Sequence, residues 1–242
     1  MPFTYNELTL RTFLMVALAL VNGCAMRPSK EHVVAGISPD GRIGITIPVL
    51  DLEHPRNLSS WNQLVEVNGG RVIADLDTGP WEAMTHSNHG GWGATWSPDG
   101  SLLLLCISGK WTSNANTLVK LKNGKVLWQK NISPDCQKEI LTRTQSADPV
   151  GYAKKRKAPD GSLTAYPEGF AIDVGIADGD TPLNLPLKIR VDLISDPKAA
   201  TYGPEYKAIE SWLNAELDEN GKLAFGEFHL GRRPDLRAGW AS

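Results

Sequence analysis

Apolar and polar residues alternate along this chain in short runs, which are separated by turns that contain glycine or proline. The clearest turn is Asn123-Gly124, which divides Thr117–Lys122 from Lys125–Lys130. This dipeptide favours a two-residue hairpin turn, because both central positions require a positive φ. We therefore expect a hairpin with Val119 opposite Trp128 on its apolar face.

Gly69-Gly70 divides two further alternating runs in the same way. A two-residue turn at this dipeptide places Val67 opposite Val72 and Val65 opposite Ala74. The sequence thus predicts two similar hairpins, one after the other.

The run Leu102–Ile107 is apolar at every position. Successive side chains of a strand point to opposite faces, so a strand here must be buried on both sides. We expect this strand to lie in a central sheet, covered by other layers on both faces.

A turn signature recurs upstream of each hairpin, as Ser38-Pro39-Asp40-Gly41 and again as Ser97-Pro98-Asp99-Gly100. Proline presets the turn, aspartate caps it and glycine accepts a positive φ. Together with Trp96 before the second turn and Asp75–Gly79 after the first hairpin, this pattern resembles the blades of Tol-type β-propellers with WD-like repeats. The resemblance covers residues 34–132 and implies propeller-like blades there.

The second half of the chain begins with helix signals. Ser133 and Pro134 suit the N-cap and first position of a helix, and Asp148-Pro149 starts a second helix. We expect a helical connector over residues 133–158. Four strand candidates follow it and predict an antiparallel sheet with one face in water: 170–177, 185–194, 209–217 and 222–230. The first two each have one apolar face, and the last two flank Asn220-Gly221, which predicts a hairpin.

These patterns predict a mainly β, antiparallel protein. Two propeller-like blades (34–132) are followed by the helical connector (133–158) and a C-terminal four-stranded antiparallel sheet (159–242).

The N-terminal residues carry a targeting signal. The apolar run from Phe13 to Val21 is too short to span a bilayer, because a spanning helix needs about 20 residues. Val21-Asn22-Gly23-Cys24 resembles a bacterial lipobox, which implies removal of residues 1–23, lipidation of Cys24 and a linker over 24–33. An ordinary signal peptide or an uncleaved anchor are the alternatives. The resemblance implies a periplasm-facing, lipid-anchored protein of the bacterial cell envelope, and Ala25 favours the outer membrane.

Charge and cysteine content limit the remaining possibilities. The formal net charge is −2, with charges spread along the chain, so we expect no nucleic-acid partner. Cys106 and Cys136 are the cysteines left after Cys24, and they are either a disulfide pair or buried free thiols.

Three short motifs match catalytic or metal patterns only in part. Asp77-Thr78-Gly79 has the tripeptide of aspartic proteases, but the sequence has no second copy, so we interpret it as a turn. Ser195 and Lys198 have the spacing of a serine–lysine pair, but Pro197 opposes the helix that such a pair needs. Asp173, Asp178 and Asp180 fit no recognised calcium loop.

The segment from Trp81 to Trp92 combines His86, Asn88 and His89 with aromatic residues and glycines. Loops of this composition are typical of binding surfaces. We therefore expect His86, Asn88, His89 and Trp92 to contribute to the binding of an envelope protein or glycan by a non-catalytic scaffold, without a metal or other cofactor. One alternative is a metal-dependent hydrolase that uses His86 and His89, although no third ligand is visible. The other is a loop whose residues serve only its own packing.

Overall fold

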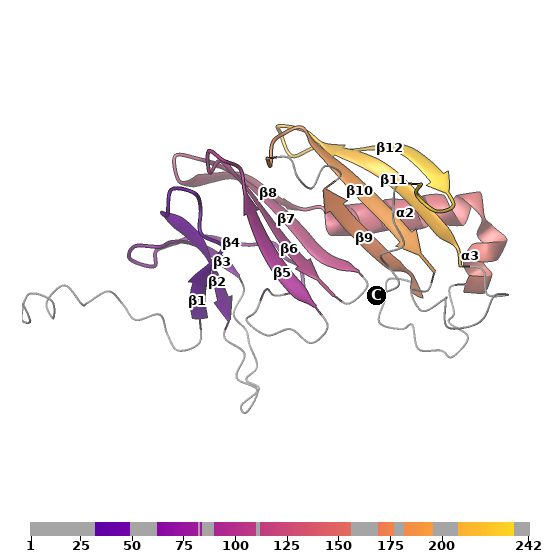
Figure 1. Ribbon diagram of the computed structural model, residues 1–242, viewed down its shortest axis with the longest axis horizontal. Helices are drawn as coiled ribbons and strands as arrows, with labels where there is room; N and C mark the ends of the chain where they lie inside the picture. The colour runs from indigo at the N-terminus through magenta and orange to yellow at the C-terminus, as the bar shows by residue number, and fades with distance from the viewer. Residues whose placement is uncertain are drawn as a thin grey trace, which may run out of the picture.

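The computed structural model of the chain describes residues 32–48, 62–81, 83, 90–109, 112–155, 169–176, 182–195 and 208–234. Within these ranges the strands form three four-stranded sheets, which we call the first, second and third sheets in chain order (Figure 1). Strands adjacent in sequence are hydrogen-bonded within each sheet, and all the pairs are antiparallel.

The elements have the following bounds. The first sheet contains β1 (His32–Ala35), β2 (Ile43–Pro48), β3 (Gln63–Glu66) and β4 (Val72–Asp75). The second contains β5 (Gly91–Trp96), β6 (Leu102–Ser108), β7 (Ser113–Lys122) and β8 (Lys125–Asn131). Helices α2 (Ser133–Ala147) and α3 (Pro149–Lys155) lead to the third sheet, which contains β9 (Ala171–Ile176), β10 (Leu187–Ile194), β11 (Glu210–Leu217) and β12 (Leu223–Leu230). The predicted mainly β, antiparallel fold class is confirmed.

The second sheet lies between the other two and contributes to two apolar cores. Its Leu103 and Leu105 pack with Ile45 and Ile47 of the first sheet, and all four side chains are fully buried. The alternate residues of β6 enter a second core on the opposite face. The prediction that Leu102–Ile107 is buried on both sides is therefore confirmed.

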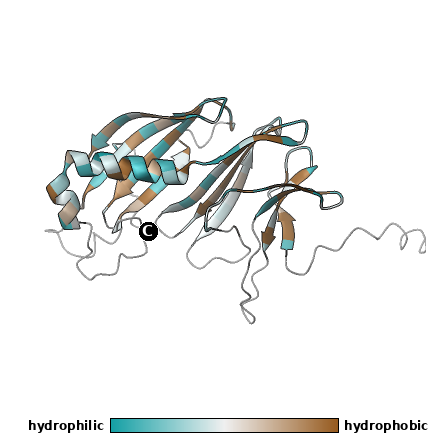
Figure 2. Cartoon of the chain, turned by 180° about the vertical axis from the view of Figure 1, so that it is seen from behind, coloured by the Kyte–Doolittle hydropathy of each residue, from teal (hydrophilic) through white to brown (hydrophobic). Residues whose placement is uncertain are grey.

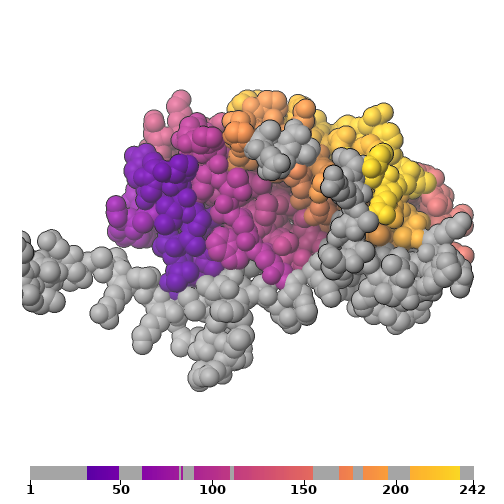
Figure 3. Space-filling model, viewed as in Figure 1, coloured from indigo at the N-terminus to yellow at the C-terminus, as the bar shows by residue number. Residues whose placement is uncertain are grey.

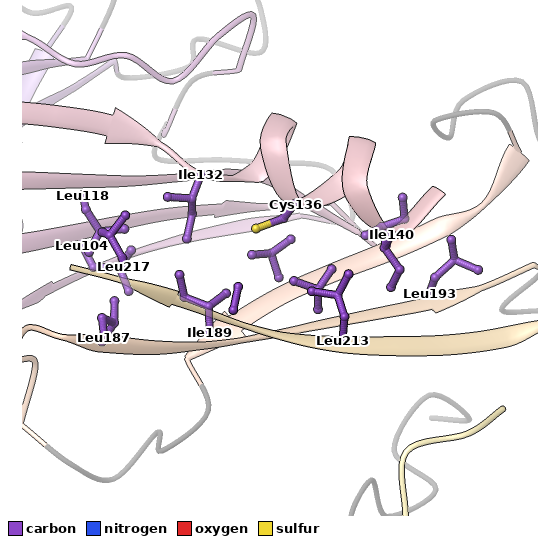
Figure 4. Close-up of a cluster of buried hydrophobic side chains, with 14 of the residues drawn as sticks. Leu104, Leu118, Ile132, Cys136, Ile140, Leu187, Ile189, Leu193, Leu213 and Leu217 are labelled. Carbon is purple, nitrogen blue, oxygen red and sulfur yellow. The ribbon is translucent and has the colours of Figure 1, made fainter. Parts of the chain in front are cut away.

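The second core joins the second sheet, α2 and the third sheet (Figure 4). Leu104 and Leu118 of the second sheet lie in the same buried cluster as Cys136 and Ile140 of α2 and Ile189 of the third sheet. The helix turns these side chains inward, and Figure 2 shows that the surface of α2 is largely hydrophilic. Burial of one apolar stripe therefore holds α2 in place.

The two Ser-Pro-Asp-Gly turns have the same hydrogen-bond network. The Ser38 hydroxyl donates a hydrogen bond of 2.7 Å to the Asp40 carboxylate, and the Ser97 hydroxyl donates one of 2.7 Å to the Asp99 carboxylate. Each hydroxyl also accepts from the backbone N–H five residues further on, over 3.0 Å and 2.8 Å. The turns connect β1 to β2 and β5 to β6, so the first two sheets begin in the same way.

The predicted pairing of the second hairpin is wrong by one residue at its far end. A β-bulge follows Lys120, so Trp128 pairs with Lys120, and Val119 pairs with Gln129. A shift of one residue moves a side chain to the opposite face of a strand. Trp128 accordingly packs against the second core, and its indole N–H donates to the Glu219 carbonyl over 3.2 Å.

The predicted pairing of the first hairpin is also wrong. Val65 pairs with Val72 and not with Ala74, and the expected Val67–Val72 pair is absent from the ladder. The chain turns over residues 67–71, which is longer than the two-residue turn predicted at Gly69-Gly70, and a register shift in β3 adds to the displacement.

Helix α2 starts one residue earlier in the chain than predicted. Ile132 occupies the N-cap position without a side-chain cap, and Ser133 is the first helical residue. The Ser133 hydroxyl instead accepts a hydrogen bond of 3.1 Å from the Asn116 amide. Asp148 caps α3 as its sequence suggests, because its carboxylate accepts from the Gly151 N–H over 2.9 Å.

Candidate functional site

The segment from Trp81 to Trp92 joins β4 of the first sheet to β5 of the second. His86, Asn88 and His89 lie outside the residues that the structure describes. Trp81, at the start of the segment, is 44% exposed. Trp92 lies in β5 and is half-buried against the core between the first and second sheets. The described flanks therefore comprise one exposed and one packed tryptophan.

The start of this segment is fixed by a buried asparagine. Asn62 is fully buried, and its side-chain carbonyl accepts from the Ala83 N–H over 2.8 Å. Its amide donates to the carbonyls of Ala83 (2.9 Å) and Thr46 (3.0 Å). These bonds satisfy the side chain of Asn62 and attach the segment to β2.

Asp77-Thr78-Gly79, just before this segment, forms a turn. The Asp77 carbonyl accepts from the Thr117 hydroxyl over 2.6 Å, and its N–H donates to the Gln129 side chain over 3.2 Å. Thr78 is fully buried, and its hydroxyl donates to the Trp81 carbonyl. The tripeptide thus connects the first sheet to the second, as its interpretation as a turn predicts.

The connections between strands differ at the two ends of the sheets. Short turns over residues 36–42, 67–71, 97–101, 123–124 and 218–222 lie at one end, which we call the turn end. The longer connections β2–β3 (49–62), β4–β5 (76–90) and β10–β11 (195–209) leave from the opposite end, which we call the connection end, together with the short β6–β7 turn (109–112) (Figure 1). One longer connection, β9–β10 (177–186), leaves from the turn end. The candidate segment belongs to the connection end.

A polar cluster on the outer face of the third sheet was not predicted from the sequence. Arg233, which follows β12, is 7% exposed and reaches across the sheet to Asp192 of β10, with 2.7 Å between Nε and Oδ1. Its other nitrogens donate to the Asn214 side chain (2.9 Å) and the Leu213 carbonyl (3.0 Å). The guanidinium carbon lies 4.3 Å from the centre of the Trp212 ring.

The charges of this cluster balance one another. Arg190 lies 2.9 Å from Asp192 and 3.2 Å from Asp173, so two arginines face two carboxylates. Burial raises the pKa of Asp192, and the guanidinium groups of Arg233 and Arg190 oppose that rise without cancelling it. Because the described polar partners of Asp192 are guanidinium groups, we interpret the cluster as an ion-pair network that links the strands. The side chain of Arg233 therefore covers part of the sheet face that was predicted to lie in water.

The remaining sequence candidates also have structural roles where they are described. Ser195 is fully buried, and its hydroxyl accepts from the Ile209 N–H over 2.9 Å. Asp173 accepts a bond of 2.7 Å from Ser113, whereas Asp178, Asp180 and Lys198 lie outside the described residues. Within the described ranges, no group of three or more His, Cys, Asp or Glu residues is arranged to hold a metal ion.

Cys106 and Cys136 are free thiols in the core between the second and third sheets. Burial raises the pKa of Cys106 to about 11 and that of Cys136 to about 12. Both thiols are therefore protonated and unreactive at neutral pH. Of the two alternatives for this pair, the structure has the free thiols, with Cys136 buried and Cys106 half-buried.

Comparisons of the chain with protein families, with curated proteins and with solved structures gave no match. The function is therefore argued from the residues of the chain itself. In the part of the chain that the structure describes, no helix is long and apolar enough to cross a membrane.

Proposed function

We propose that the chain is a non-catalytic, lipid-anchored protein of the bacterial cell envelope, which binds a protein or glycan partner. In this proposal Cys24 carries the lipid and the chain faces the periplasm, with the outer membrane as the favoured location. The first two sheets act as propeller-like blades of a scaffold that also includes the third sheet, and the partner binds at the connection end.

The observation that carries this proposal is the difference between the two ends of the sheets. At the turn end, the connections within the first two sheets and between β11 and β12 are short turns closed by backbone hydrogen bonds. Most of the longer connections, including the segment with His86, Asn88 and His89, leave from the connection end. Binding residues occur preferentially on loops that a rigid scaffold positions.

The position of the segment also supports the proposal. Asn62 and the turn at Asp77 hold its first residues, and Trp92 holds its far end in the core. A loop anchored at both ends presents its side chains with less loss of conformational entropy on binding. Exposed Trp81 supplies an aromatic side chain of the kind that contributes most binding energy at interfaces.

The proposal can be tested by capture of cross-linked envelope partners with the full-length protein. The double substitution His86→Ala with His89→Ala should abolish capture and leave the melting temperature unchanged. The matched control is Lys122→Ala with Lys125→Ala, which removes two exposed charges at the turn end and should leave capture intact.

Two outcomes would contradict the proposal. Full recovery of partners by the histidine variant would remove the segment from the binding surface. Stoichiometric zinc in the purified protein, lost in the histidine variant, would instead support the metal-dependent hydrolase.

A further inference from the structure

The outer face of the first sheet carries an apolar row that crosses its four strands. Val65 of β3 pairs with Gly44 of β2 on one side and with Val72 of β4 on the other. A Cβ atom at Gly44 would lie 2.6 Å from a methyl group of Val34 and 3.6 Å from the side chain of Ile37. These five residues, which we call the outer row, are therefore contiguous.

The two ends of the outer row are exposed and its centre is buried. Ile37 is 49% exposed and Val72 is 47% exposed, whereas Val34 is half-buried and Gly44 and Val65 are buried. The opposite face of the sheet packs on the second sheet, and within the described ranges no helix or strand lies beyond the outer face of the first sheet (Figures 1 and 3). The first sheet thus ends the stack, with Ile37 and Val72 as the exposed members of the outer row.

Two ion pairs border the outer row at the turn end. Arg42 lies 2.7 Å from Asp40, and Arg71 pairs with Glu66. The side chains of Arg42 and Arg71 are 79% and 67% exposed, so their guanidinium groups reach solvent beside Ile37 and Val72. Apolar side chains next to exposed arginines are the combination found where proteins rest on phospholipid headgroups.

The distance to the proposed anchor is short. Seven residues, 25–31, separate Cys24 from His32 at the start of β1. Fully extended, this segment spans about 25–30 Å, so the first sheet stays near the bilayer that holds the lipid. Tethering makes the contact intramolecular, and a weak apolar contact is then sufficient to orient the protein.

From this geometry we propose that the exposed ends of the outer row, Ile37 and Val72, lie against the phospholipid surface, so that the first sheet is the membrane-facing side of the protein. The inference rests on the proposed lipid anchor at Cys24. Ile37 and Val72 contact the headgroup region, and Arg42 and Arg71 lie next to lipid phosphates. The third sheet then lies farthest from the bilayer.

The test uses the full-length, processed protein in vesicles of phosphatidylethanolamine and phosphatidylglycerol. Ile37→Cys and Val72→Cys are labelled separately with an environment-sensitive fluorophore. Leu127→Cys is the control, because Leu127 is 57% exposed but lies on β8 of the second sheet. Burial raises the pKa of Cys106 and Cys136, and the parent protein treated with the same fluorophore measures any labelling of these two thiols.

We expect the emission of the probes at positions 37 and 72 to shift to shorter wavelength on vesicles and to be quenched by brominated lipids, while position 127 changes in neither respect. Water-like emission at 37 and 72 in protein that floats with vesicles would overturn the membrane-facing surface but not the anchor. Protein that does not float would overturn both. A shift that rises with protein concentration in the absence of vesicles would assign the outer row to a second copy of the chain and overturn the proposal.

Discussion

The indole N–H of Trp96 donates a hydrogen bond of 2.7 Å to the backbone carbonyl of Gly36. Trp96 ends β5 of the second sheet and Gly36 follows β1 of the first, so this bond joins the two sheets at the turn end. Gly36 has a φ of +56°, and a Cβ atom there would lie 2.7 Å from that of Ala94. Only glycine allows this close approach without displacement.

Gly36→Ala should destabilise the protein more than Gly41→Ala. Both glycines have a positive φ, but a Cβ at Gly41 would meet no atom within 4 Å. We expect a loss of about 1 kcal/mol for Gly41→Ala from backbone strain, and about 1–2 kcal/mol more for Gly36→Ala from the clash with Ala94. Urea denaturation measures both, and equal losses would contradict the close approach of the sheets.

Arg233→Ala should destabilise the protein by about 3–5 kcal/mol, because it leaves the buried Asp192 carboxylate with one charged partner fewer. The double variant with Asp192→Ala should lose less than the sum of the two single variants, because no unpaired charge remains from this pair. Arg42→Ala is the control and should have no measurable effect, since that ion pair is exposed. Additive losses in the denaturation of the single and double variants would show that Arg233 and Asp192 act independently.

Trp128→Ala should cost about 2–3 kcal/mol, less than for a fully buried tryptophan, because the side chain is half-buried. Trp128→Phe should cost about 1 kcal/mol through loss of the bond to the Glu219 carbonyl. Thermal and urea unfolding test both values. A Trp128→Ala protein as stable as the parent would contradict the packing of this side chain between the second and third sheets.

Acid should weaken the two Ser-Pro-Asp-Gly turns. Hydrogen bonds from Ser38 and Ser97, followed by those from the backbone, lower the pKa of Asp40 and Asp99 from 3.8 to about 2. Because the folded-state pKa is the lower one, the stabilisation is complete above about pH 4 and is lost as the pH falls towards 2. The urea concentration at the midpoint of unfolding should decrease as the pH is lowered from about 4 to 2. This decrease should be smaller in the variant with asparagine in place of both Asp40 and Asp99. Parallel curves for the two proteins would contradict the role of these carboxylates.

The layering of the second sheet was predictable, because an apolar side chain at every position of Leu102–Ile107 requires cover on both faces. The strands of the third sheet were also predictable, because apolar residues alternate along β9 and β10 and Asn220-Gly221 predicts the hairpin of β11 and β12. The two-residue turn at Asn123-Gly124 was predictable, and next to it Leu121 pairs with Val126 as such a turn requires. The bulge after Lys120 and the longer turn over 67–71 were not predictable, because the turn dipeptides carry no signal for either.

The cluster around Arg233 could not be predicted, because its contacts are long-range in the sequence. Asp192 and Arg233 are 41 positions apart and meet only when β10, β11 and β12 pair. For the segment from Trp81 to Trp92, its position between two sheets and the tryptophans at its ends could be predicted from the sequence. The buried Asn62 that fixes its base gave no signal, because a single asparagine near a turn is common.

The intact mass of the protein extracted from bacterial membranes tests most directly whether the chain is a lipid-anchored envelope protein. We predict a chain that begins at Cys24 and carries diacylglycerol, and a Cys24→Ser variant that is neither lipidated nor retained in the membrane fraction. An unmodified chain that begins elsewhere, or a Cys24→Ser variant that is processed and membrane-bound like the parent, would contradict it.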